Sequence, residues 1–218
     1  MSIVNQNAIT KIEKSGKIKV AFIGDSVTYG HFLDDPITMS FPGLIKKAMP
    51  QTKFDVQNFA LSGTTLTFNG DEPYVNSELY QQSLRFNPDV VVIMLGTNDS
   101  KPINFDNEKI SKYKSDAVSL INSYRSLESA PIIYFNTSPV VLGDGLAKGS
   151  EYWISNKNVC YIAKLQREVA DENDTCQIDI YDKTQYFTEK MFRENDGVHP
   201  GAFGHQELAK IILNAFGV

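Results

Sequence analysis

The chain of 218 residues has only two cysteines and one tryptophan, and it lacks any long hydrophobic run. Cys160 and Cys176 are too few for a disulfide framework and do not have the spacing of a metal-binding motif. We interpret them as free thiols in a reducing compartment. No window approaches the roughly 20 apolar residues of a membrane-spanning helix. The first residues do not have the pattern of a secretory signal, so we expect a cytoplasmic protein that does not enter a membrane.

The sequence also lacks a surplus of positive charge. It has 21 Lys and Arg against 26 Asp and Glu, which gives a formal net charge of −5. The basic residues are scattered, so nucleic acid and anionic membranes are poor candidates for partners. Internal repeats, low-complexity tracts and obvious linkers are missing too. With 42% hydrophobic residues, the length suits a single domain, residues 1–218, with a sizeable core.

The chain does contain a regular alternation of apolar, β-branched runs with helical patterns. The runs predict strands over residues 18–24, 53–61, 89–96, 131–136 and 176–182. The helical patterns cover residues 40–50, 76–86, 107–127, 156–173 and 201–216. This alternation predicts an α/β fold of three α/β/α layers, with a five-stranded, doubly wound parallel sheet of the flavodoxin type. Ligands of such sheets bind beyond the carboxyl ends of the strands.

Polar groups suited to catalysis follow three of the predicted strands. Ser26 follows the first strand, Gly63 the second and Asn98 the third. A hydroxyl, an unobstructed backbone N–H and a carboxamide are therefore expected at one edge of the sheet. Near the end of the chain, Asp196 and His199 stand three residues apart, just before the last predicted helix.

Together these groups meet the requirements of acyl transfer. Ser26 is a candidate nucleophile, His199 a candidate base, and Asp196 can hold the imidazole in one tautomer. The N–H groups of Ser26 and Gly63 and the side chain of Asn98 are candidate oxyanion donors. Taken singly, Ser26, Gly63 and Asn98 also suit ordinary turns.

Two further histidines offer alternatives. His31 lies five residues after Ser26 and is a rival base. His205 lies within the last predicted helix, and we interpret it as a surface or packing residue. Asp25 is interpreted as an acceptor that orders the turn before Ser26.

Four segments, "GDSVTYG", "SGTT", "GTND" and "DGVH", resemble in this order the signature motifs of the SGNH hydrolases, also called GDSL-type esterases or lipases. The resemblance spans most of the chain and implies the SGNH hydrolase fold. It also implies a catalytic triad and an oxyanion hole, made of Ser26, Asp196, His199, Gly63 and Asn98. The order of four separate blocks makes the resemblance far more specific than any one of them.

The loops at the same edge of the sheet bear on the substrate. Phe68, Tyr74 and Phe105 are candidates for a shallow apolar wall. Tyr152 and Trp153 follow the fourth predicted strand, and an aromatic there either stacks on a sugar ring or packs under its loop. The loops resemble a branch of the family that acts on acetylated carbohydrates. We therefore predict a serine esterase for short acyl esters, acetyl esters of sugars in particular.

Other functions remain open on the sequence alone. A thioesterase or an acyltransferase needs the same triad. A non-catalytic flavodoxin-like domain would bind phosphate or flavin at the first turn, but that turn lacks the Thr- and Ser-rich wrap expected around a phosphate. No cofactor is required for the predicted chemistry. The acidic residues and histidines form no metal-ligand set beyond the pair Asp196 and His199.

Overall fold

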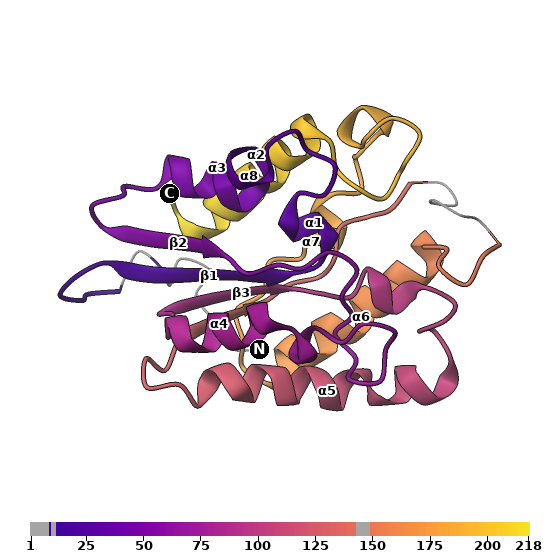
Figure 1. Ribbon diagram of the computed structural model, residues 1–218, viewed down its shortest axis with the longest axis horizontal. Helices are drawn as coiled ribbons and strands as arrows, with labels where there is room; N and C mark the ends of the chain where they lie inside the picture. The colour runs from indigo at the N-terminus through magenta and orange to yellow at the C-terminus, as the bar shows by residue number, and fades with distance from the viewer. Residues whose placement is uncertain (1–8, 10–11, 143–148) are drawn as a thin grey trace.

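The computed structural model describes Ile9, residues 12–142 and residues 149–218. A parallel sheet forms the middle of the molecule, and its four strands run in the order β2-β1-β3-β4 (Figure 1). The strands are β1 (Ile18–Gly24), β2 (Phe54–Asn58), β3 (Val90–Met94) and β4 (Ile132–Phe135). They confirm four of the predicted strands and the parallel α/β fold.

Helices cover both faces of this sheet. The α-helices are α1 (Ser26–Tyr29), α2 (Pro36–Met39), α3 (Phe41–Ala48), α4 (Glu78–Phe86), α5 (Asn107–Arg125), α6 (Asn156–Glu172), α7 (Ile180–Lys183) and α8 (Ala202–Phe216). Short 3₁₀ helices are η2 (Tyr74–Asn76), η3 (Asn98–Ser100) and η4 (Glu189–Met191). Figure 1 shows α3 and α8 on one face and α4, α5 and α6 on the other.

The two faces carry separate hydrophobic cores because side chains of a strand alternate in direction. Val20 and Phe22 of β1 pack in the core beneath α3 and α8. Ala21 and Ile23 of the same strand pack in the core beneath α5. The strand reads as a continuous apolar run in the sequence because both of its faces are covered.

The predicted helices are confirmed, with ends set by particular side chains. Ser40 caps α3, since its hydroxyl accepts the backbone N–H of Gly43 at 3.3 Å. Asn87 ends α4 in the left-handed conformation, at a φ of 50°, directly before Pro88. A residue before proline is disfavoured in a helix, which agrees with the predicted stop.

The predicted fifth strand at residues 176–182 is wrong. In the part of the chain described, Cys176 forms one isolated parallel bridge with Tyr134 at the edge of the sheet. The next backbone donor is then taken by a side chain, because Ile178 donates its N–H to Asn136 Oδ1 at 2.8 Å. The chain turns into α7 at residue 180, so the ladder cannot continue, and the sheet has four strands among the described residues.

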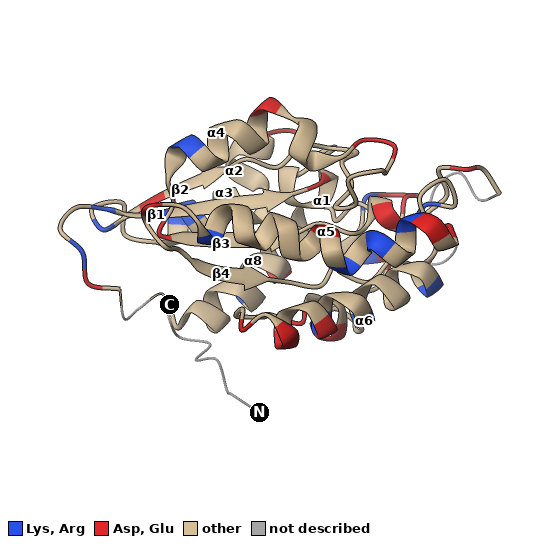
Figure 2. Cartoon of the chain, turned by 90° about the horizontal axis from the view of Figure 1, so that it is seen from below, with Lys and Arg blue, Asp and Glu red and all other residues tan. Residues whose placement is uncertain are grey.

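Charged side chains on the helical surface include both signs. Figure 2 shows Lys, Arg, Asp and Glu interspersed along α5 and α6. Lys114 of α5, for example, lies 2.7 Å from Glu172 and 3.4 Å from Glu168 of α6. Every helix within the described ranges is too short or too polar to cross a membrane.

Candidate active site

Ser26 stands at a sharp turn between β1 and α1. Asp25 caps α1 through Oδ1, which accepts the N–H of Val27 at 3.0 Å, as expected of a turn-ordering acceptor. Gly24 is required here, because a Cβ atom on it would lie 2.1 Å from Thr28 Oγ1 and 2.8 Å from the carbonyl oxygen of Met94. The close approach of α1 to the sheet therefore fixes Ser26 at the carboxyl end of β1.

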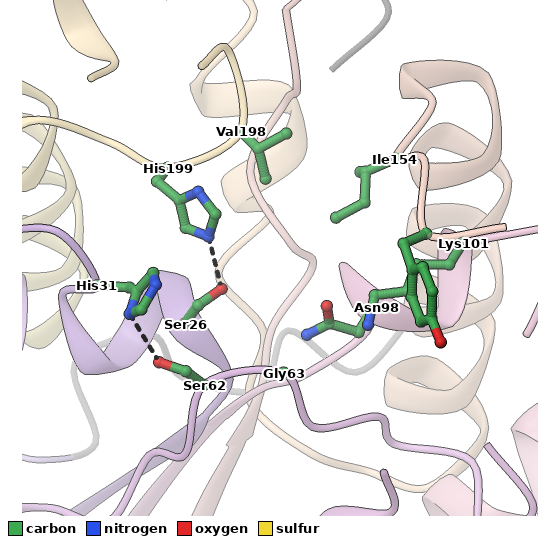
Figure 3. Close-up of a pocket in the computed structure, with 10 residues that line it drawn as sticks. Ser26, His31, Ser62, Gly63, Asn98, Lys101, Ile154, Val198 and His199 are labelled. Carbon is green, nitrogen blue, oxygen red and sulfur yellow. Dashed lines mark hydrogen bonds between the residues drawn. The ribbon is translucent and has the colours of Figure 1, made fainter. Parts of the chain in front are cut away.

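Ser26, His199 and Asp196 form a continuous chain of hydrogen bonds. His199 Nε2 lies 3.1 Å from Ser26 Oγ, although 173 residues separate them (Figure 3). The other ring nitrogen, Nδ1, lies 2.9 Å from Asp196 Oδ2. Asp196 Oδ1 accepts the N–H groups of Val198 and His199, at 2.8 and 2.9 Å. Burial alone would raise the pKa of Asp196, but these hydrogen bonds and His199 outweigh it and hold the pKa below its usual value.

Gly197 lets the segment around His199 turn towards Ser26. Its φ of 74° is in the left-handed region, and a Cβ atom would lie 2.7 Å from the carbonyl oxygen of Leu142. Leu142 in turn donates its N–H to the carbonyl oxygen of Gly197 at 2.8 Å. This contact ties the segment to the loop that leaves β4, and so orients the imidazole.

Gly63 and Asn98 face Ser26 across the same cavity. Asn98 Nδ2 donates one N–H to the carbonyl oxygen of Thr64 at 3.0 Å. An amide nitrogen carries two N–H groups, so a second remains for a ligand. Gly63 has a φ of 89° and also borders the cavity. Ser26 is the first residue of α1, where a backbone N–H has no acceptor within its own helix.

The cavity has a volume of about 320 Å³. It is bordered by side chains from several loops that lie far apart in the sequence, most of which Figure 3 labels. They are Ser26, His31, Ser62, Gly63, Asn98, Lys101, Tyr152, Ile154, Val198 and His199. Three kinds of group thus meet at this cavity: a hydroxyl that can act as a nucleophile, an imidazole that can act as a base, and several hydrogen-bond donors.

Comparison with known proteins shows the family of this chain. Residues 22–207 match the GDSL-like lipase/acylhydrolase family. The chain belongs to this family. The family is one of ester hydrolases, and the resemblance carried by the four sequence motifs is confirmed. A related acetylxylan esterase from Xylanibacter ruminicola is 30% identical over 214 residues. The match covers 93% of this chain and 44% of the relative, so the GDSL-family chain spans less than half of that protein's length.

Solved structures share the fold of this GDSL-family chain. A lipase/acylhydrolase from Enterococcus faecalis superposes with a TM-score of 0.70 at 23% identity, over 90% of this chain and 94% of the other. An acetylxylan esterase from Geobacillus stearothermophilus superposes with a TM-score of 0.68 at 21% identity, over 94% of this chain and 97% of the other. These likenesses support the SGNH hydrolase fold.

Two of the residues predicted to form an apolar wall lie away from the cavity of this GDSL-family chain. The prediction for Tyr74 is wrong, because its side chain is fully buried in the core and its hydroxyl donates to the carbonyl oxygen of Phe59 at 2.8 Å. Phe105 packs edge-on against Tyr161, with 5.6 Å between ring centroids. Neither residue borders the cavity.

Phe68 and Trp153 also lie outside the cavity lining. Phe68 is 39% exposed. The neighbours of Trp153, namely Tyr152 and Ile154, border the cavity instead. The predicted loop borders the cavity, but the direction of each of its side chains depends on packing that the local pattern does not encode. Residues 143–148 of this predicted loop lie outside the described residues.

The three histidines have different hydrogen-bond partners. His31 Nδ1 lies 3.4 Å from Ser62 Oγ, so the rival base contacts a different serine. Burial lowers the pKa of His31, and the nearby His199 lowers it further. His205 is a packing residue, as predicted. It is fully buried, and its Nδ1 accepts the backbone N–H of Phe41 at 3.1 Å.

Sequence reasoning missed the residues that support Asn98 in this GDSL-family site. Asp99 accepts the N–H groups of Leu66 and Thr67 at 2.9 and 2.8 Å, which ties the turn after β3 to the loop after β2. Asn104 is fully buried and donates Nδ2 to the carbonyl oxygen of Asn98 at 2.9 Å. Asp99 is the last residue of the "GTND" motif, which was a usable signal. The sequence around Asn104 has none.

Proposed function

We propose that this chain is a serine esterase that hydrolyses short acyl esters, and that its substrates are acetylated carbohydrates. The hydrogen-bonded chain Ser26–His199–Asp196, which opens onto a cavity with donors on the facing side, is the observation that carries the proposal. Membership of an ester hydrolase family supports the reaction class. The names of the related acetylxylan esterases support the choice of an acetylated carbohydrate.

The reaction follows from the positions of the groups. His199 Nε2 accepts the proton of Ser26 Oγ as the oxygen attacks the ester carbonyl carbon. The negative charge that develops on the carbonyl oxygen is stabilised by the N–H groups of Ser26 and Gly63 and by Nδ2 of Asn98. The C–O bond then breaks, and the imidazolium gives its proton to the departing alcohol oxygen.

Water completes the cycle by the same route. His199 accepts a proton from water as the hydroxide attacks the acyl-enzyme, and Ser26 leaves with that proton restored. One ester and one water thus give one carboxylic acid and one alcohol. Asp196 remains ionised and stabilises the imidazolium through Nδ1.

The cavity favours a small acyl group. Its volume of about 320 Å³ has to hold the acyl group and part of the alcohol. Ile154 and Val198 supply apolar surface in it. A thioesterase or an acyltransferase would use the same groups with a different substrate or acceptor, so analysis of the products separates these reactions.

The test compares the wild type with Ser26→Ala on p-nitrophenyl esters of increasing acyl length and on acetylated xylan. We expect the acetate ester to be the best substrate of the series. We expect Ser26→Ala to lower kcat by roughly 10³-fold or more, because a triad acts as a unit. Ser119→Ala, a change on the outer surface of α5, is the matched control. Rates like those of the wild type in Ser26→Ala would refute the proposal.

A further inference from the structure

A second polar pair borders the cavity beside the proposed triad. Ser62 Oγ and His31 Nδ1 lie 3.4 Å apart, and both residues line the cavity and are half-buried. The ring of His31 lies 5.4 Å from the ring of His199, centroid to centroid. The reaction proposed above gives no role to either member of this pair.

His31 and Ser62 lie on one side of the cavity. Figure 3 shows them on the His199 side of Ser26, with Ile154 and Lys101 across the cavity from them. In an ester hydrolase the departing oxygen must lie close to the imidazole that protonates it, so the alcohol part of the substrate occupies the His199 side. The acyl group then points away from His199, towards the side of the cavity that includes Ile154. The polar pair therefore faces the alcohol, next to its ester oxygen.

The backbone that carries His31 is held in an unusual conformation. Gly30 has a φ of 89°, and Phe32 has a φ of 69°, which is rare for a bulky residue. Phe32 is fixed by two contacts. The guanidinium of Arg193 lies 4.0 Å from the centre of its ring, and the ring meets His199 edge-on at 5.2 Å. Such conformations persist where surrounding contacts enforce them, and they cluster at functional sites. The segment thus places His31 firmly beside His199.

The protonation of His31 suits the binding of a neutral hydroxyl group. Its lowered pKa favours the uncharged imidazole near neutral pH, with one nitrogen as donor and the other as acceptor. The Ser62 hydroxyl can both donate and accept. An alcohol hydroxyl also does both, so it can take part in a hydrogen-bonded group with these two side chains.

We propose that His31 and Ser62 bind a hydroxyl group of the alcohol part of the substrate. This hydroxyl lies on the carbon adjacent to the one that bears the ester oxygen, so the pair selects monoesters of vicinal diols. A partly acetylated sugar ring presents this arrangement, whereas a simple alkyl ester does not. The inference rests on the proposed esterase function and specifies the alcohol that the site recognises.

The test uses two matched esters, trans-2-hydroxycyclohexyl acetate and cyclohexyl acetate, which differ in one neighbouring hydroxyl. The readout is the ratio of kcat/KM for the hydroxy ester to kcat/KM for the plain ester. We expect a ratio well above one for the wild type. Ser62→Ala and His31→Phe should each lower this ratio by roughly three- to tenfold, the usual effect of one hydrogen bond between neutral groups. Ser119→Ala on α5 should leave the ratio unchanged.

The outcomes separate the two proposals. A wild-type ratio near one, or a ratio that neither variant changes, would overturn the role of the pair while leaving the esterase intact. A wild type that hydrolyses neither ester would overturn the proposed function itself. Because a ratio is internal to each enzyme sample, partial misfolding of His31→Phe lowers both rates alike, and Ser62→Ala provides a second, smaller change.

Discussion

Asn98 illustrates how hydrogen bonds hold a single residue of the proposed site in position. Its side chain donates to the carbonyl oxygen of Thr64, and its backbone carbonyl oxygen accepts from Asn104 Nδ2. The first contact orients the carboxamide and the second holds the backbone that carries it, before any substrate arrives. A donor that is already in place stabilises a developing charge without the cost of reorganisation.

Replacement of Asn98 by Ala should therefore lower kcat by roughly 10²–10³-fold with a much smaller change in KM, because the lost hydrogen bond strengthens only as the oxyanion forms. Steady-state kinetics with p-nitrophenyl acetate measure the effect, and circular dichroism verifies that the variant is folded. Asn122→Ala, on the exposed side of α5, is the control. A decrease of less than about threefold would remove Asn98 from the proposed oxyanion hole.

Single residues also show what a sequence reveals about a site. Ser26 and His199 could be chosen as candidates because few side chain types perform the proposed chemistry, and because strand ends restrict where such residues occur. Tyr74 could not be placed, since an aromatic in a loop serves equally well in a core or at a cavity. Lys101 and Ser62 were overlooked because surface-type residues have many roles, and only their neighbours in space decide among them.

Among the helices, α3 and α8 are joined by an unusual contact. The buried ring of His205 in α8 accepts the first N–H of α3, from Phe41, and stacks on the Phe41 ring with 6.1 Å between centroids. Burial lowers the pKa of His205 to about 4, against an ordinary value near 6.5. The folded state thus holds fewer protons than the unfolded state between these values. The free energy of unfolding therefore decreases as the pH falls through this window.

The variant His205→Asn keeps an acceptor near the Nδ1 position but does not titrate. We expect it to be less stable than the wild type at pH 7, because it fills less space. From pH 6.5 to pH 4 it should lose less stability than the wild type. The difference should be up to about 3 kcal/mol, the free energy that corresponds to a pKa lowered from 6.5 to about 4. Urea unfolding at both pH values measures this difference.

Phe41→Leu provides the comparison for His205→Asn. It removes packing at the same contact between α3 and α8 and leaves the histidine in place. Its stability should therefore fall with pH as steeply as that of the wild type. Parallel pH profiles for the wild type and His205→Asn would show that His205 does not titrate in this range.

The elements themselves were predictable to the extent that their own residues define them. Apolar runs predicted the four strands, and the helical patterns predicted the longer helices to within a few residues of their ends. The prediction of the fifth strand was wrong because a residue outside the predicted segment prevents its pairing. Asn136 captures the backbone donor of Ile178, and no pattern within residues 176–182 reveals that competition.

In the molecule as a whole, β1 belongs to both hydrophobic cores. Its even-numbered residues Val20 and Phe22 pack on one side, and Ala21 and Ile23 on the other. Loss of either core would expose a face of the central strand, so neither layer is expected to persist alone. The prediction of one domain over residues 1–218 can therefore be tested by unfolding.

We therefore expect a single cooperative unfolding transition. Far-UV circular dichroism reports on all helices, and fluorescence reports on Trp153, the single tryptophan. Urea curves from the two probes should coincide in midpoint and slope, as they do for two-state domains. Trp153→Phe, followed by circular dichroism alone, checks that the tryptophan does not alter the midpoint. Two separated midpoints would contradict the one-domain interpretation.

The contact between Ser26 and His199 has a consequence for the protein during its synthesis. The two residues are separated by 173 positions in the sequence. A nascent chain that has not yet reached His199 carries the proposed nucleophile without the group that would activate it. The proposed esterase can therefore act only after the segment around His199 has been made and has packed against Ser26.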